Sequence, residues 1–173
     1  RTGSGIWIHG MYKSMISRPP RDSDGCVVLN NDDLFSIFDQ LLDKNTPVIL
    51  AESAPLDYLV KADSNEDFIG VFNSWISTWE SRDVEKYLGF YSADFDNDGK
   101  NFNQWAMHKR RVNRQKTFID IDAEKLSVFD YPSEENLRLV EFYQDYKSNN
   151  YNGAAWKRQF WSQQDGAWQI VYE

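Results

Sequence analysis

The sequence predicts an α+β protein in two parts: a β-rich N-terminal part, and a larger part in which helices pack on a curved antiparallel sheet. In residues 66–113, apolar side chains recur at the 3.6-residue period of helices, and beyond residue 119 the period changes to that of strands. Residues 1–51 contain short glycine-bounded apolar runs on either side of one helical pattern. Helices and strands are therefore segregated, which is typical of α+β folds.

Three elements are expected in the N-terminal part. The Ile-Trp-Ile run at residues 6–8 predicts a buried strand, followed by a loop rich in Ser, Arg, Pro and Asp over residues 11–25. Asn30 or Asn31 is a suitable N-cap for a helix. The apolar face of that helix is formed by Leu34, Ile37, Phe38, Leu41 and Leu42. A second buried strand is expected at residues 48–51.

A linker is expected at residues 52–65, because this segment contains proline, mixed charge and no periodicity. We place a domain boundary near residue 62, which divides the chain into residues 1–62 and residues 63–173. Each part then has its own pattern of elements, so the two are interpreted separately.

The second part begins with an amphipathic helix. Its aromatic face is formed by Phe68, Phe72, Trp75, Ile76 and Trp79. Shorter helices are expected at residues 83–91 and 101–113. Strands are then expected at residues 119–128, 137–146, 156–161 and 168–172. Asp165-Gly166 predicts a hairpin turn between the last two strands.

Composition excludes several classes of protein. The 173 residues include 41% hydrophobic residues and 7 Trp, which suffices to bury a core and excludes a disordered chain. With 19 Lys+Arg against 27 Asp+Glu the net charge is −8, which disfavours nucleic acid as a partner. The longest apolar runs are too short to cross a bilayer. Cys26 is the sole cysteine, so we predict no disulfide, no thiolate metal site and no cofactor.

An acidic stretch resembles the beginning of a calcium-binding EF-hand loop. Asp94, Asp96 and Asp98 alternate and are followed by a glycine, as at the first ligand positions of such a loop. Position 12 would be Trp105 instead of the glutamate that supplies two ligand oxygens. We therefore interpret the stretch as an Asp-rich turn before the third helix and predict no metal site.

A histidine and a cysteine carry the chemistry that the sequence suggests. His9 precedes Cys26 by 17 residues, and a thiol needs a neighbouring base or positive field to act as a nucleophile near neutral pH. Gly25 permits a tight turn in which backbone amides point at a developing oxyanion. Arg18 and Arg21 are candidates for gripping a substrate carboxylate. A lone cysteine is more often a small buried apolar residue, but its pairing with histidine favours catalysis.

Residues 6–10 (Ile-Trp-Ile-His-Gly) and 23–29 (Ser-Asp-Gly-Cys-Val-Val-Leu) resemble the L,D-transpeptidase (YkuD-type) catalytic domain, a β-rich cysteine enzyme that acts on peptidoglycan stem peptides. The spacing between the histidine and the Ser-x-Gly-Cys element makes the resemblance specific. It covers about residues 1–51, which correspond to the C-terminal portion of such a domain. We therefore expect a larger natural protein with an upstream part.

This resemblance implies a covalent mechanism. Cys26 would attack the amide between the diamino acid and the terminal D-alanine of a stem peptide and form a thioester. His9 would act as base toward the thiol and then as acid toward the leaving amine. The amides of Gly25 and Cys26 would form the oxyanion hole.

The sequence departs from the family pattern at two positions. Asp24 stands where the family commonly has histidine, and Val28 where many members have arginine. Recognition of the substrate carboxylate is therefore assigned to Arg21 first and Arg18 second. Ser23 and Asp24, which precede the nucleophile in the chain, complete the predicted substrate-binding residues of this part.

Residues 66–173 resemble the nuclear transport factor 2-like (NTF2-like, also SnoaL-like) fold, in which helices close a curved sheet into a cone with a pocket. The resemblance rests on the order of elements and on the stretches at residues 79–83 and 168–172. Certain L,D-carboxypeptidases that shape bacterial cells are similar, because they join a transpeptidase-type domain to such a cone.

Three basic residues are candidates for gripping an anionic glycan or peptide group at the expected pocket. His108 and Arg110 belong to a basic run on the third helix, and Arg158 lies on a strand. The alternative is a solvated helix face, the commoner role of such a run. Sugar-stacking platforms or core packing would account for Tyr143, Tyr146, Trp156, Phe160 and Trp161.

These features predict an exported, peptidoglycan-processing cysteine acyltransferase of the periplasm or cell envelope. Hydrolysis of the thioester would trim the stem to a tripeptide, and transfer to a second stem would form a cross-link; the cone favours trimming. One alternative is a noncatalytic module that binds the cell wall or forms a homodimer through the cone. Another is a small-molecule enzyme in the cone, which would need an acid/base pair such as Asp145 and His108.

Overall fold

The computed structural model of the protein describes residues 7–15, 17, 19, 23–39, 65–131, 134 and 136–173. Contacts divide the chain into two compact units, Arg1–Val48 and Ile49–Glu173, which are described separately below. The strand predicted at residues 48–51 and the boundary predicted near residue 62 lie outside the described residues.

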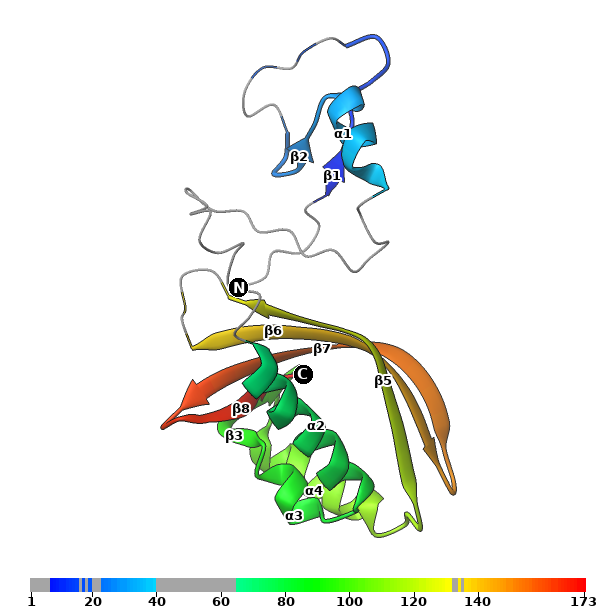
Figure 1. Cartoon of the computed structure of the whole chain (residues 1–173), viewed down its shortest axis with the longest axis vertical. Coiled ribbons are helices and arrows are strands. Elements are labelled where there is room, and N and C mark those ends of the chain that lie inside the picture. The colour runs from blue at the N-terminus through cyan, green and yellow to red at the C-terminus, as the bar shows by residue number, and fades with distance from the viewer. Residues whose placement is uncertain are drawn as a thin grey trace. The chain divides into compact units, whose positions relative to one another are not determined.

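The N-terminal unit contains β1 (Ile8–His9), β2 (Val27–Val28) and α1 (Asn31–Phe38) (Figure 1). The two strands are parallel, with the pairing extended by a hydrogen bond at each end. The Asn30 side chain accepts a hydrogen bond of 2.9 Å from the backbone N–H of Asp32 and caps α1. The predicted helix start is therefore confirmed.

The C-terminal unit is built on a six-stranded sheet with the order β4-β3-β8-β7-β6-β5. Its strands are β3 (Tyr91–Asn97), β4 (Lys100–Asn101), β5 (Ile119–Asp130), β6 (Leu137–Ser148), β7 (Asn152–Gln164) and β8 (Ala167–Tyr172). Its helices are α2 (Glu66–Glu80), α3 (Val84–Leu88) and α4 (Phe102–Asn113). The long strands β5, β6 and β7 curve around these helices, which lie on the concave side of the sheet (Figure 1).

The three helices and the four long strands predicted for this unit are confirmed, and two strands were missed. Residues 91–97 form β3, where we had expected a helix end and an Asp-rich turn. Two adjacent buried residues, Tyr91 and Ser92, and a register irregularity before Asp96 break the alternation by which strands are recognised. Because β3 pairs parallel to β8, the sheet is antiparallel except at this one pair.

Two tight Asp-Gly turns join strands of the sheet, and the sequence predicted one of them as a hairpin. Asp165 and Gly166 have φ of 50° and 80° and join β7 to β8, which confirms the hairpin signal. Asp98 and Gly99 have φ of 47° and 83° and join β3 to β4. The acidic stretch therefore forms a strand and a hairpin turn.

Aromatic packing between α2 and the sheet forms the core. Phe68, Phe72 and Trp75 of α2 are fully buried, as their helical spacing predicts. The Phe72 ring centroid lies 5.0 Å from that of Phe142 on β6, and the Phe68 centroid lies 5.4 Å from that of Trp161 on β7. Both pairs meet edge to face, a favourable geometry for aromatic rings. This packing fixes α2 against the sheet. A cavity lies beside the C-terminal parts of α2 and α4.

Candidate functional site

The pairing of β1 with β2 brings the segment of His9 beside the segment that follows Cys26. His9 pairs with Val28, and the backbone N–H of Val27 donates a 2.9 Å hydrogen bond to the carbonyl of Trp7. Side chains two residues apart in an extended strand point to the same face, and paired residues share a face. Cys26 directly precedes β2, so continued extended geometry predicts its side chain on the face of Val28 and His9.

Among the described residues, one ring nitrogen of His9 forms a hydrogen bond and the other does not. Its Nδ1 lies 2.8 Å from the carbonyl oxygen of Gly10. A carbonyl oxygen accepts hydrogen bonds and cannot donate them, so Nδ1 carries the proton of this bond. In the neutral ring, Nε2 then has its lone pair available. The side chain is exposed, and no hydrogen bond to Nε2 occurs among the described residues, so this nitrogen can accept a proton.

The turn before the cysteine is fixed by two features. Gly25 has φ of 99°, a conformation that L side chains rarely adopt, so a residue with a Cβ would be strained there. The Ser23 hydroxyl donates a 2.6 Å hydrogen bond to the carbonyl of Cys26. Cys26 is half-buried with a free thiol, and Asp24 is exposed. Ser23 therefore orders the turn through the backbone.

Asn31 is a supporting residue that the sequence indicated as a capping candidate without assigning it to the site. Its Oδ1 accepts a 2.8 Å hydrogen bond from the backbone N–H of Met11. A Cβ added at Gly10 would lie 2.2 Å from this oxygen, so this close approach requires glycine. Asn31 thus ties the segment after His9 to the first turn of α1.

Arg18 and Arg21, predicted to bind the substrate carboxylate, lie outside the described residues. Their assignment stays a prediction.

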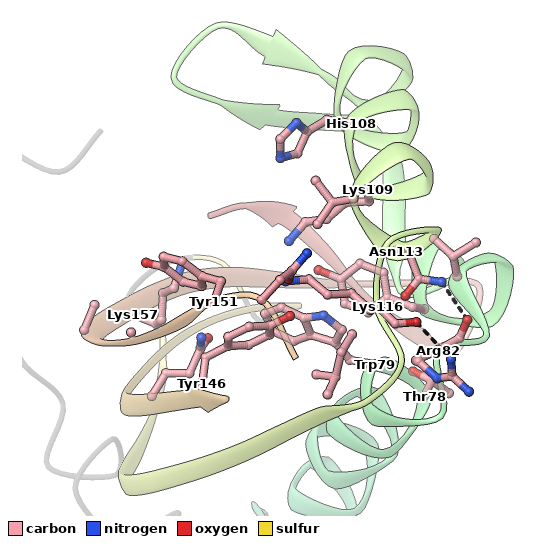
Figure 2. A pocket seen from close by; sticks show the side chains of 18 of the residues that line it. Thr78, Trp79, Arg82, His108, Lys109, Asn113, Lys116, Tyr146, Tyr151 and Lys157 are labelled. Atoms are coloured by element: carbon pink, nitrogen blue, oxygen red, sulfur yellow. Dashed lines mark hydrogen bonds between the residues drawn. The ribbon is translucent and has the colours of Figure 1, made fainter. Parts of the chain in front are cut away.

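The C-terminal unit contains a cavity of about 650 Å³. It lies between α2, α4 and the curved strands, and Figure 2 shows Lys109 extending from α4 toward its interior. Five basic side chains contribute to its wall: Arg82, His108, Lys109, Lys116 and Lys157. Aromatic side chains form much of the remainder: Trp79, Tyr87, Tyr146 and Tyr151. The cavity therefore combines positive charge with flat apolar surface.

Lys116 is 8% exposed and its ammonium group is held by neutral partners. Its Nζ donates to the Ser148 hydroxyl at 2.9 Å and to Oδ1 of Asn150 at 2.5 Å. The Nζ also lies 5.4 Å from the Tyr146 ring centroid. Within the described residues, Lys116 forms no ion pair. A buried cation without a carboxylate partner is a favourable position for an anionic ligand group.

Lys109 occupies an aromatic cage. Its Nζ lies 4.2 Å, 4.7 Å and 5.4 Å from the ring centroids of Trp105, Trp79 and Tyr87. Burial lowers the pKa of Lys109 to about 8, with a partly opposing effect of the Glu173 charge. A substantial fraction of this amine is therefore neutral in mildly alkaline solution.

Glu173 is the buried acid next to the cavity. Its Oε1 lies 3.2 Å from Nζ of Lys157, and its Oε2 accepts hydrogen bonds from Gln159 at 3.2 Å and from the Tyr91 hydroxyl at 3.1 Å. Burial alone would raise the pKa of Glu173, but the charges of Lys109 and Lys157 outweigh it and lower the pKa below its usual value. The carboxylate is therefore ionised and partly neutralises the positive wall.

Of the three basic residues predicted at the pocket, one lines this cavity. His108 does so, and burial and the charge of Lys109 lower its pKa. Arg110 lies elsewhere, in a bidentate pair with Glu85 whose two hydrogen bonds are both 2.7 Å. Arg158 is also absent from the cavity wall and donates a 2.6 Å hydrogen bond to Glu141 on the neighbouring strand. The guanidinium groups of Arg110 and Arg158 are therefore both paired with a glutamate on a neighbouring helix or strand.

Other expectations for the C-terminal unit can be placed as well. Asp145 is not among the cavity-lining residues, and its carboxylate lies 3.4 Å from Nζ of Lys147. The acid/base pair suggested for Asp145 and His108 therefore has no support in the cavity. Searching the described ranges gives no group of three metal-ligating side chains. In the same ranges, no helix is sufficiently long and apolar to cross a membrane.

Family comparisons agree with this division of the chain. The family described as the Cds6 C-terminal NTF2-like domain matches residues 67–173, which is more than half of the sequence. The chain belongs to this family. A second family, described as the L,D-transpeptidase catalytic domain (YkuD), matches residues 1–50. An L,D-transpeptidase fragment thus precedes the NTF2-like domain, and both resemblances inferred from the sequence are confirmed. A search of curated proteins gave no match.

Solved structures resemble nearly the whole chain. Bd1075 of Bdellovibrio bacteriovorus is 26% identical with a TM-score of 0.72, over 99% of this chain and 61% of Bd1075. Pgp2, a helical cell shape determining protein of Campylobacter jejuni, is 27% identical with a TM-score of 0.65, over 99% of this chain and 61% of Pgp2. The chain thus spans about three fifths of these proteins. An NTF2-like protein of unknown function from Pseudomonas putida shares the fold of the NTF2-like domain at 13% identity, with a TM-score of 0.53, over 63% of this chain and 82% of that protein.

Proposed function

We propose that the protein is a peptidoglycan-processing cysteine acyltransferase of the cell envelope. The observation that carries the proposal is the parallel pairing of β1 and β2, which brings the chain at His9 beside the chain that directly follows Cys26. The match of residues 1–50 to the L,D-transpeptidase catalytic domain supports it, as does the likeness to Pgp2, a cell shape determining protein. The substrate is the tetrapeptide stem, cleaved before its terminal D-alanine.

The reaction follows from the groups that these two segments carry. Nε2 of His9 takes the thiol proton as Sγ of Cys26 attacks the amide carbon before D-alanine. The tetrahedral oxyanion is stabilised by the backbone N–H groups at the Gly25 turn. When it collapses, the carbon–nitrogen bond breaks, the imidazolium returns its proton to the leaving amine, and a thioester remains. Water then releases a tripeptide and restores the thiol.

Hydrolysis is the favoured second step. Val28 stands where many L,D-transpeptidases have arginine, so the chain has one cation fewer beside the nucleophile for holding a second stem peptide. The same acyl-enzyme could still pass to an amine, which makes the ratio of tripeptide to dimer the measure of the proposal.

Incubation of the natural full-length protein with disaccharide tetrapeptide is expected to yield disaccharide tripeptide and free D-alanine. Cys26→Ala should lower turnover by at least about 10³-fold, because the covalent route is lost. Ser36→Ala, an exposed change on α1 in the same unit, serves as the matched control and should leave turnover unchanged. Mass spectrometry of the products is the measurement. Accumulation of cross-linked dimers would replace trimming with transpeptidation, and the absence of both products would overturn the proposal.

The cavity favours a second role, in which the C-terminal unit holds an anionic group of the cell wall. Arg82, Lys109 and Lys116 all line it, and none of the three forms an ion pair within the described residues. Tyr146 and Tyr151 add flat surfaces suited to a sugar ring. This role can accompany catalysis by the N-terminal unit or act without it.

Lys116→Met is expected to weaken muropeptide binding about tenfold or more, because it removes a buried ammonium group and keeps an apolar stem. Titration calorimetry with soluble disaccharide tetrapeptide measures this in the Cys26→Ala background, which prevents turnover. Lys86→Met, a change at an exposed lysine paired with Asp83 on α3, is the control and should bind as the parent does. Equal affinity of the two variants, with circular dichroism showing both folded, would contradict the binding role.

A further inference from the structure

We propose that Lys109 is a nucleophilic amine that forms an imine with a small carbonyl compound bearing an anionic group. This reactivity goes beyond the function proposed above, because it uses the cavity of the C-terminal unit and requires neither Cys26 nor His9. It rests on where α4 places the amine, on what surrounds it, and on the charge of the remaining cavity wall.

Burial of the Lys109 amine disfavours its charged form and is the main cause of its lowered pKa. Three aromatic rings within 5.4 Å of Nζ favour a cation, but Lys109 forms no ion pair or hydrogen bond with another described side chain that would add to this stabilisation. With the pKa lowered to about 8, about half of the amine is neutral at pH 8, against about 0.3% for a lysine of ordinary pKa 10.5. A desolvated lysine in an apolar pocket is a known arrangement for attack on carbonyl carbons.

The charged groups around Nζ select the ligand. Lys109 is faced by Glu173, which is engaged by Lys157, Gln159 and Tyr91. The other charged or titratable side chains of the wall are Arg82, Tyr87, His108, Lys116, Tyr146, Tyr151 and Lys157. Positive charge therefore exceeds negative charge at the wall, and an anionic group is the favoured partner for it.

A further polar group in the wall lacks a partner. Gln144 is 7% exposed and lines the cavity, and its Oε1 has no hydrogen-bond partner among the residues that the structure describes. A buried amide oxygen left unpaired costs free energy that a ligand hydroxyl or N–H can recover. The cavity thus offers a nucleophilic amine, an excess of cations and a vacant acceptor within one volume of about 650 Å³. A compact ligand that has both a carbonyl group and an acid group could use all three of these features.

The chemistry needs only a proton from solvent besides the amine and the carbonyl compound. The neutral Lys109 amine attacks the carbonyl carbon, a carbon–nitrogen bond forms, and the carbonyl oxygen takes the proton that the nitrogen releases to give a carbinolamine. The hydroxyl takes one proton from solvent and leaves as water, so that amine, carbonyl compound and one proton are converted to a protonated imine and water. The iminium charge occupies the place of the former ammonium, where the rings of Trp79, Tyr87 and Trp105 stabilise a cation.

Reductive trapping tests the proposal on the unmodified full chain. The protein is incubated with pyruvate and cyanoborohydride, and each lysine is followed by peptide mass spectrometry. We expect Lys109 to gain a carboxyethyl group at least about tenfold faster than Lys86 and Lys147, the exposed controls. The Lys109 rate should rise up to about pH 8 and then level off, while the rates at the controls continue to rise.

Two comparisons separate this site from general amine reactivity. The ratio of labelling at Lys109 to labelling at Lys86 should be smaller with acetone, a neutral ketone, than with pyruvate, because acetone lacks the acid group that the cavity cations bind. Labelling of Lys109 in the Cys26→Ala variant should equal that in the parent, so the result is independent of the proposed acyl transfer. Labelling of Lys109 by pyruvate at or below the rate of Lys86 would overturn the proposal, and an equal Lys109-to-Lys86 ratio with acetone would overturn its anionic part.

Discussion

Replacing His9 with glutamine is expected to slow acylation of Cys26 by about 10²- to 10⁴-fold, the usual contribution of a positioned general base. The side chain is exposed, so the change should leave the fold intact. Glutamine can hydrogen-bond to the Gly10 carbonyl as the imidazole does, but it cannot accept the thiol proton. Mass spectrometry of the intact protein after timed exposure to a carbapenem, which acylates reactive cysteine, gives the rate.

The chain supplies a matched control for this change. It has two histidines, and the other one, His108, lies on α4 in the C-terminal unit. His108→Gln should acylate at the parental rate. The His9→Gln variant should recover activity as pH rises, because hydroxide then generates the thiolate that the imidazole no longer forms. Equal rates for the two variants at neutral pH would remove His9 from the mechanism.

Much of the C-terminal fold could be predicted because its helices and long strands have clean periods. Phe68, Phe72 and Trp75 repeat at helical spacing and are fully buried on α2. β3 escaped prediction because its burial pattern is irregular and its position depends on a parallel partner, β8, which lies about 70 residues further along the chain. Tertiary pairing of this kind leaves no local signal.

The two candidate sites also differ in how much of each could be predicted from the sequence. His9 and Cys26 could be proposed from the sequence because both belong to short motifs, one ending β1 and the other leading into β2. The cavity cations come from distant elements: Lys109 from α4, Lys116 from the segment before β5, and Lys157 from β7. A local basic run predicted Arg110 instead, whose partner Glu85 lies on α3 and becomes a neighbour only through the packing of two helices. Charge clusters that form by folding therefore require the structure.

Trp161→Ala is expected to destabilise the C-terminal unit by about 3–5 kcal/mol, the usual cost of removing a large buried aromatic side chain. Trp161 is 0% exposed, and its ring centroid lies 5.4 Å from that of Phe68 and 6.2 Å from that of Trp75. Its Nε1 donates a 3.0 Å hydrogen bond to the buried side chain of Gln159. The substitution would therefore leave both a cavity and an unpaired amide oxygen.

Trp156 offers a matched control on the same strand, since it is 41% exposed and lies opposite Tyr143 on the outer part of the sheet. Trp156→Ala should cost about 1 kcal/mol or less, because exposed aromatic pairs contribute little. Urea unfolding followed by far-UV circular dichroism gives both free energies of unfolding. The difference between the two free energies tests whether α2 and β7 share one core. Trp161 contacts Phe68 and Trp75 of α2, whereas Trp156 is partly exposed, so only the loss of Trp161 should be costly. Equal costs would mean that the Phe68–Trp161 contact does not stabilise the unit.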